Sequence, residues 1–312
     1  MPSASTSSPQ AISSDQLDAM KDAQDILLEG IVRDDDEIAE LSQGDPEEVI
    51  LYYPWEGVDG VQLYRQDFRQ LEPPGWLDDS LIEIGLKLFQ IRLEEANPEL
   101  AEQIHIFTPF FYPILSKNTD NLEEGYRHVR GWTDADKVDI FRKKYLVVPI
   151  NRSFHWYLAI IYHPEYALDD STEERRCVLT SYPVDRQTTV MTDRASIWTL
   201  DPLGFDRPEV VDTLAFYLKA EAREKHGVSI SDQKLVGRKA LTPTQPNWYD
   251  CGPYILVFAK AFMTSPDDFL ESISGNKAES FWVAEEFQAI RNFLKAEINK
   301  FSKQWTAWKK SH

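Results

Sequence analysis

The stretch that decides the fold is QPNWYDCG at residues 245–252, together with the apolar run PYILVFAKAFM that follows at 253–263. This run predicts a buried helix with Pro253 in its first turn, where the missing N–H costs no hydrogen bond. Cys251 then lies at the helix N-terminus. Aligned peptide dipoles and unpaired N–H groups favour an anion there, so the pattern indicates a thiolate nucleophile.

Two neighbours of the cysteine fit a reactive site. Gly252 allows close approach of another segment, and Gln245 can direct its side-chain amide toward the same point as an oxyanion donor. The alternative is a structural cysteine at the start of a core helix, since free cysteine is among the most buried residue types.

Composition narrows the class of protein. The 312 residues are 42% hydrophobic and 12% aromatic, which predicts a well-formed core. A formal net charge of −19 argues against nucleic acid or membrane as partners and favours partners with basic patches. The two cysteines argue against a disulfide scaffold or a metal site and for a reducing, intracellular compartment. No apolar run approaches twenty residues, no signal peptide is recognisable, and nothing calls for a cofactor.

The chain divides into a tail at 1–46 and a domain at 47–312. The tail is expected to be disordered: residues 1–12 are rich in Ser, Thr and Pro, a short helix is possible within 17–27, and an acidic run follows. Its acidic part is a solvated linker or, with the apolar residues at 26–32, a strand-addition peptide.

In the domain, strands are expected at 49–54, 145–150, 156–162 and 197–201, and helices near 79–89, 209–226, 251–263 and 281–308. An insertion is expected at 164–196 and a linker at 227–245. This mixture without strict alternation predicts an α+β fold with helices against a small sheet.

Four polar residues lie where regular elements begin or end. His155 precedes a buried strand, Asp201 ends another, and Gln245 leads into Cys251. Cysteine proteolysis needs this set: a thiolate, a histidine that protonates the leaving amine, an acid that orients the imidazole and an oxyanion donor. His155 could instead be an edge-strand histidine. Cys177 lies within a strand-like run, which favours a structural cysteine over a nucleophile. Asp193 and Asp206 end no buried strand, so Asp201 is the better candidate for the orienting acid.

A family resemblance rests on six motifs in order. They are WLDD at 76–79, VDIF at 138–141, VPIN at 148–151, HW at 155–156, LD at 200–201 and QPNWYDCG at 245–252. Together they resemble the SUMO-specific (sentrin-specific) cysteine proteases. The resemblance implies a papain-like superfold with a small mixed central sheet flanked by helices. It makes Cys251 the nucleophile, His155 the general base and acid, and Asp201 its orienting residue. Gln245 and the Cys251 N–H become the oxyanion hole.

The resemblance also implies a substrate. Trp76 and Trp156 match two tryptophans that roof the channel for the modifier's Gly-Gly tail, and Asp79 matches an acid that pairs with a basic residue of SUMO. The expected partners are SUMO, SUMO-conjugated proteins and poly-SUMO chains, for a monomer in the nucleus or cytoplasm. The long insertion between His155 and Asp201 resembles the branch that trims poly-SUMO chains. The sequence departs from the family at Asp78, usually Asn, at Pro202, usually Ser, and at Pro253, usually Val or Ile.

Three other functions remain open from the sequence. One is a protease for another ubiquitin-like modifier, and another is acyl transfer to protein side chains. Roofing tryptophans argue against the latter because they narrow the channel to glycine. A third is a non-catalytic SUMO-binding module, against which the full catalytic set argues.

Overall fold

The computed structural model describes residues 35–56, 60–135, 138–168, 194–275 and 281–312. Within these ranges, five strands form one sheet in the order β3-β4-β5-β6-β7. Their bounds are β3 Ile104–Ile106, β4 Tyr145–Arg152, β5 His155–Tyr162, β6 Ala195–Leu200 and β7 Leu235–Lys239. The three central strands are antiparallel, and each edge strand runs parallel to its neighbour. The small mixed sheet confirms the predicted α+β fold.

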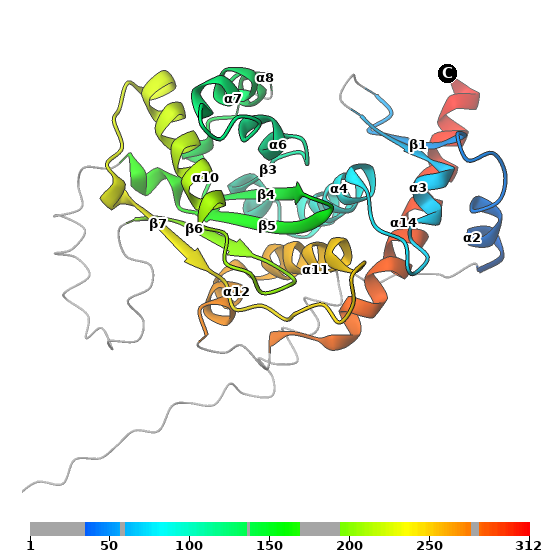
Figure 1. Cartoon of the computed structure of the whole chain (residues 1–312). Helices are drawn as coiled ribbons and strands as arrows, with labels where there is room; N and C mark the ends of the chain where they lie inside the picture. Colours follow the sequence, from blue (N-terminus) through cyan, green and yellow to red (C-terminus); the bar gives the residue numbers. More distant parts are fainter. Residues whose placement is uncertain (1–34, 57–59, 136–137, 169–193, 276–280) are drawn as a thin grey trace, which may run out of the picture.

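Helices cover both faces of this sheet (Figure 1). The larger ones are α4 Asp79–Ala96, α7 Leu122–Val129, α10 Pro208–Glu221, α11 Cys251–Thr264, α12 Pro266–Ile273 and α14 Ala284–Ser311. Shorter ones are α2 Asp35–Leu41, α3 Arg65–Arg69, α5 Pro98–Gln103, α6 Phe111–Leu115 and α8 Trp132–Ala135. A π-helical turn, Ala222–His226, extends α10, and Gly227 with φ +67° ends it.

Side-chain alternation in the central strands divides the core into two layers. Along β5, Leu158 and Ile160 face α4, α11 and α14, whereas Tyr157 and Ile161 face α6, α7 and α10. Because successive strand residues point to opposite faces, a strand that is apolar throughout must be buried on both. This explains why β5 has no polar residue after His155.

Helix α11 is the most deeply buried helix of the fold. All its residues from Cys251 to Met263 are buried, and it packs against β5, α4 and α14. Its one charged side chain, Lys260, is fully buried and is neutralised by Glu286 of α14, with Nζ and Oε1 2.7 Å apart. A helix held on all sides presents Cys251 from a rigid base.

The N-terminal part of the described chain packs on the domain upstream of residue 47. The guanidinium of Arg65 donates to the carbonyl oxygen of Leu41 and pairs with Glu48, and Arg69 Nε donates to the Ser42 carbonyl oxygen at 2.7 Å. These arginines are the first and last residues of α3, so they hold the backbone of this segment against the domain while its acidic side chains remain exposed. The helix expected within 17–27 lies outside the described residues.

A hairpin precedes α4 and is held by the C-terminal helix. Strands β1 Val49–Tyr53 and β2 Val61–Tyr64 are antiparallel, and Ser302 of α14 donates to the Ile50 carbonyl oxygen at 2.6 Å. The two ends of the domain are therefore joined directly.

The predicted linker at 227–245 is wrong in one part, because it contains β7. This edge strand has the sequence LVGRK and only half-buried or exposed side chains, so it carries no apolar alternation that a sequence could show. Strands β2 and β3 were not predicted either, because they have four and three residues. Most of the expected insertion, with its strand near 177–182, lies outside the described residues. No helix among the described residues is long and apolar enough to cross a membrane.

Two glycines give a matched test of packing. A Cβ at Gly125 in α7 would lie 1.9 Å from the Leu115 carbonyl oxygen, whereas a Cβ at Gly131 would meet nothing within 4 Å. We expect Gly125→Ala to lower the free energy of unfolding by about 3 kcal/mol, since overpacking here displaces backbone. Gly131→Ala should leave it unchanged or raise it by about 0.5 kcal/mol. Equilibrium urea unfolding measures both, and equal stability of the two variants would contradict the close approach of α7 to α6.

Candidate active site

Cys251 is the first residue of α11 and is 3% exposed. The turn before it is fixed by Asn247, whose Oδ1 accepts from the backbone N–H groups of Tyr249 and Asp250, each at 3.0 Å. Gly252 is needed at the next position because a Cβ there would lie 2.9 Å from the Leu77 Cβ. The helix that carries the cysteine therefore packs directly against the segment that carries Trp76.

His155 and Asp201 come together across neighbouring strands. His155 begins β5, Asp201 follows the last residue of β6, and β5 pairs with β6. The Nε2 atom of His155 lies 2.8 Å from Asp201 Oδ1. The structure thus brings together the predicted histidine and acid, which are far apart in the sequence.

The Asp201 carboxylate has partners on both oxygens. Oδ1 also accepts from the backbone N–H of Leu203 at 2.7 Å, in a turn that Gly204 completes with φ +74°. Oδ2 accepts from Arg207 Nε at 2.7 Å and lies 2.6 Å from its Nη2. The guanidinium in turn lies 4.5 Å from the centre of the Tyr157 ring. The role of Arg207 could not be predicted from the sequence, because the residue lies in a polar loop before a proline.

The electrostatics of the pair favour a charged imidazole. Burial lowers the pKa of His155, but hydrogen bonds to Asp201 and Cys251 outweigh it and raise the pKa to about 9. Burial raises the pKa of Asp201, but the bonds from His155 and Leu203 outweigh it and hold that pKa below its usual range. At neutral pH the site therefore holds an imidazolium beside Cys251, and an imidazolium is the form that acts as an acid toward a leaving amine.

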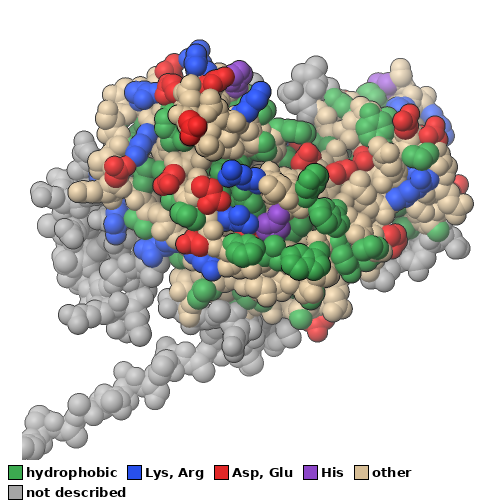
Figure 2. Space-filling model, in the orientation of Figure 1, with side chains coloured by type: hydrophobic (Ala, Val, Ile, Leu, Met, Phe, Trp, Pro, Cys, Tyr) green, Lys and Arg blue, Asp and Glu red, His purple; other side chains and the backbone are tan. Residues whose placement is uncertain are grey.

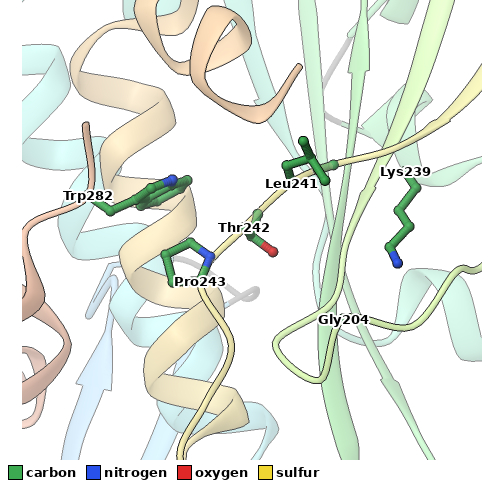
Figure 3. Close-up of a pocket in the computed structure, with 7 residues that line it drawn as sticks. Gly204, Lys239, Leu241, Thr242, Pro243 and Trp282 are labelled. Carbon is green, nitrogen blue, oxygen red and sulfur yellow. The ribbon is translucent and has the colours of Figure 1, made fainter. Parts of the chain in front are cut away.

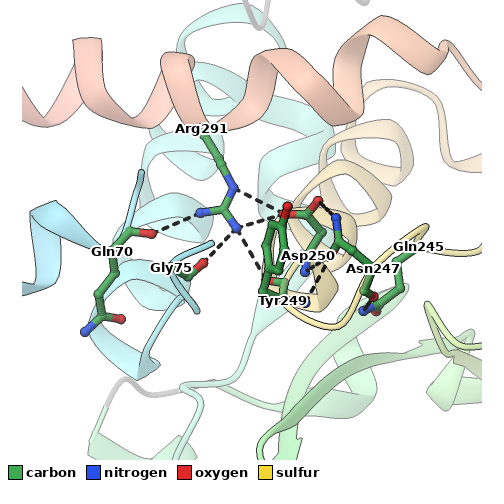
Figure 4. A network of polar contacts seen from close by, with 7 residues as sticks. All are labelled: Gln70, Gly75, Gln245, Asn247, Tyr249, Asp250 and Arg291. Carbon is green, nitrogen blue, oxygen red and sulfur yellow. Dashed lines mark hydrogen bonds and ion pairs between the residues drawn. The ribbon is translucent and has the colours of Figure 1, made fainter. Parts of the chain in front are cut away.

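Gln245 belongs to a series of hydrogen bonds in the loop that leads to Cys251 (Figure 4). Its Nε2 donates to the Asn247 carbonyl oxygen at 2.6 Å, and Asn247 Nδ2 donates to Asp250 Oδ2 at 2.6 Å. One Nε2 hydrogen is thereby engaged and fixes the amide, which leaves the second for another acceptor. The arrangement is compatible with the oxyanion donor expected at this position.

Arg291 of α14 is the last member of this series of hydrogen bonds, and its role was not predicted from the sequence. Its guanidinium donates to Asp250 Oδ1 at 2.8 Å, to the carbonyl oxygens of Gln70 at 3.0 Å and Gly75 at 2.8 Å, and to that of Tyr249 at 3.3 Å. A signal existed: Arg291 falls three and seven residues before the buried Leu294 and Ile298, on the apolar face of α14. A charged residue on such a face indicates a buried polar partner.

The expected substrate-binding residues differ in exposure, and only Trp76 presents an open ring surface. Trp76 is 47% exposed, whereas Trp156 is 2% exposed and its Nε1 donates to the Leu77 carbonyl oxygen at 2.8 Å. Asp79, in the first turn of α4, has its pKa raised by burial, opposed by a hydrogen bond with Asn151. The structure thus places Trp156 beneath the segment that holds Trp76.

Asp78 shows how this chain accommodates a departure from the family. It caps α4, its Oδ1 accepting from the Leu81 N–H at 2.9 Å. Burial raises the pKa of Asp78 to about 7, the Leu81 N–H opposes this, and the neighbouring Asp67 carboxylate reinforces it. A protonated carboxyl can donate to Asp67 as an asparagine amide would, so Asp78 can replace Asn here.

The surroundings of the site are apolar. Among the described residues, the large exposed hydrophobic side chains are Trp76, Phe110, Phe154, Phe205, Leu241 and Trp248. All except Phe110 are candidate site residues or lie within four residues of one in the sequence. On one face of the molecule, hydrophobic side chains gather beside a histidine and basic side chains (Figure 2). Such grouping marks a surface that binds a partner.

A separate hollow of about 400 Å³ lies between the Gly204 turn and the segment leading to Gln245 (Figure 3). Lys239, Leu241, Thr242, Pro243 and Trp282 line it. None of the candidate catalytic side chains does, so the hollow is not the reaction site. Among the described residues, no group of His, Cys, Asp and Glu could hold a metal ion.

A histidine paired with an aspartate, close to a cysteine at a helix N-terminus, is the set of groups that a thiol hydrolase needs. Residues 75–299 match the model of the Ulp1 protease family, C-terminal catalytic domain, and the chain belongs to that family. The resemblance found in the sequence motifs is thereby confirmed.

Two relatives that are named as proteases align with most of this chain. Ubiquitin-like-specific protease 2 of Schizosaccharomyces pombe is 32% identical over 275 residues, which cover 83% of this chain and 43% of the relative. Sentrin-specific protease 7 of Mus musculus is 29% identical, over 72% of this chain and 26% of the relative. The chain thus spans less than half the length of either relative.

Solved structures show the same fold. The crystal structure of a de-sumoylating protease superposes with a TM-score of 0.66 at 21% identity, covering 84% of this chain and 94% of that one. The C-terminal Ulp1 protease domain in complex with SMT3, the yeast ortholog of SUMO, gives 0.54 at 20% identity, covering 88% and 97%.

Replacing Asp201 tests the origin of the imidazolium. In Asp201→Asn the charge is lost, so the pKa of His155 should fall from about 9 toward its ordinary value of about 6.5. The required imidazolium is lost as pH rises through the His155 pKa. The alkaline limb of the kcat/KM profile should therefore lie near pH 9 in the unaltered enzyme and below pH 8 in the variant. Asp206→Asn, an exposed change five residues away, should leave the limb in place, and an unmoved limb in Asp201→Asn would contradict this role.

Proposed function

We propose that this chain is the catalytic part of a deSUMOylating thiol protease. It would hydrolyse the peptide or isopeptide bond after the Gly-Gly tail of SUMO. The observation that carries the proposal is the 2.8 Å contact between His155 and Asp201 beside Cys251 at the start of α11, in a chain of the Ulp1 protease family. A reducing compartment, nucleus or cytoplasm, suits a protein that depends on a thiolate.

The mechanism follows from the placement of the groups. The Cys251 thiolate attacks the carbonyl carbon of the terminal glycine, and the oxyanion accepts hydrogen bonds from the Gln245 amide and the Cys251 N–H. His155 engages Asp201 through Nε2, so its Nδ1 is the nitrogen that gives a proton to the leaving lysine or α-amine. The amine leaves and a thioester remains. His155 then takes a proton from water, whose oxygen attacks the thioester, and the thiolate is restored with a free glycine carboxylate.

The proposed tail channel explains the choice of substrate. Trp76 lies on the loop before α4 and is proposed to cover the tail, and Trp156 supports that loop through its hydrogen bond to Leu77. A covered channel admits an extended chain without side chains, so glycine is a steric requirement at the last two positions. Asp79, at the start of α4, is proposed to pair with a basic residue of the modifier. Poly-SUMO chains are proposed as natural substrates because the spacing between His155 and Asp201 resembles the chain-trimming branch.

A modifier panel tests this function. We expect a fluorogenic SUMO conjugate to be cleaved in preference to ubiquitin and other modifiers, and SUMO dimers to be separated as well. Changing either glycine of the tail to alanine should lower kcat/KM by roughly 10²-fold, because a small displacement of the scissile carbonyl has that effect.

Cys251→Ser provides the control, since it should bind the same conjugate without turnover. Preferential cleavage of another modifier would contradict SUMO as the substrate and would identify the chain as a protease for that ubiquitin-like modifier. Binding by the unaltered chain without cleavage of any conjugate would favour a non-catalytic module.

A further inference from the structure

The turn that presents His155 has an unusual backbone. β4 and β5 pair up to Arg152 and His155, so that Ser153 and Phe154 alone form the hairpin loop. Both have positive φ, 55° and 62°. This is the pattern of a type I′ turn, whose central positions favour Asn and Gly because other side chains meet the backbone there. A bulky phenylalanine is a poor choice for such a position.

Packing gives no reason for the phenylalanine. Phe154 is 79% exposed, so its ring contributes little to the core. Its aromatic neighbour is Trp76, whose ring centre lies 6.3 Å away at an interplanar angle of 58°, and that ring is itself half-exposed. An exposed ring held in a strained conformation costs stability, which points to a role in binding.

We propose that Phe154 is a substrate-binding residue whose ring extends the roof of Trp76 over the Gly-Gly tail of the modifier. This rests on the function proposed above. The strained turn places the ring immediately before His155, and Trp76 meets it from the loop before α4. Trp156 is only 2% exposed, so the open aromatic surface next to His155 is formed by Trp76 and Phe154.

The chemistry of the occupant fits these two rings. A Gly-Gly segment has bare methylene groups and flat peptide planes, which can lie on aromatic faces without side chains in the way. Closing over the tail would remove the Phe154 ring from water. Phe154 should therefore favour binding and alignment of the tail while it disfavours the folded state of the free protein.

Two variants in one turn separate these effects. Phe154→Asn suits the positive φ and removes the ring, whereas Ser153→Asn suits the neighbouring positive φ and leaves the ring in place. We expect both to raise the unfolding midpoint by about 2 °C. Phe154→Asn should lower kcat/KM for a fluorogenic SUMO conjugate by about tenfold, the scale of burying part of a phenylalanine ring. Ser153→Asn should keep the rate of the unaltered enzyme.

The readouts distinguish this inference from the function on which it rests. If the unaltered enzyme cleaves no modifier conjugate, the proposed function fails. If it cleaves SUMO and Phe154→Asn cleaves it equally well, the function stands and the role of Phe154 is overturned. A loss of both stability and activity in Phe154→Asn would also overturn it, because the ring would then serve folding. The proposed role of Phe154 is supported if both variants are more stable than the unaltered enzyme and only Phe154→Asn is less active.

Discussion

The site depends on one buried guanidinium. Arg291 of α14 donates to the loop before α4, through Gln70 and Gly75, and to the residues before the cysteine, through Tyr249 and Asp250. Removing a charged donor of this kind leaves several partly buried acceptors unpaired, which is more costly than losing one surface ion pair. Because the same group contacts both segments, it joins the loop that bears Trp76 to the turn that precedes Cys251.

The central sheet and helix α11 also fix the positions of the candidate catalytic residues. The central strands, buried on both faces, bring His155 and Asp201 to the same sheet edge, and α11 carries Cys251 against that sheet. The histidine and acid thus stand on strands while the thiol stands on a helix packed across them. Catalytic geometry that relies on rigid elements is more exact than geometry built on loops. Trp76 and Phe154, which are proposed to touch the substrate, lie on a loop and a turn instead.

Much of this could be predicted from the sequence, and the exceptions share a physical cause. The buried helix after Cys251 and the apolar strands after His155 and before Asp201 are strong patterns, because burial dictates their composition. Arg207 and Arg291 could not be assigned partners, since their acceptors lie elsewhere in the sequence and an arginine does not show its acceptor. Strand β7 was not predicted because an edge strand with half-buried or exposed side chains needs no apolar alternation. The strain at Phe154 is a backbone property that composition cannot reveal.

The most direct test of the central claim is covalent trapping by a SUMO derivative whose C-terminal glycine ends in a thiol-reactive propargyl amide. Peptide mapping by mass spectrometry should find one adduct per chain, on Cys251, because the tail delivers the electrophile to the thiolate. His155→Ala should form the adduct much more slowly. An adduct on Cys177, or none while free iodoacetamide still reacts with Cys251, would contradict the assignment of Cys251 as the nucleophile that receives the modifier tail.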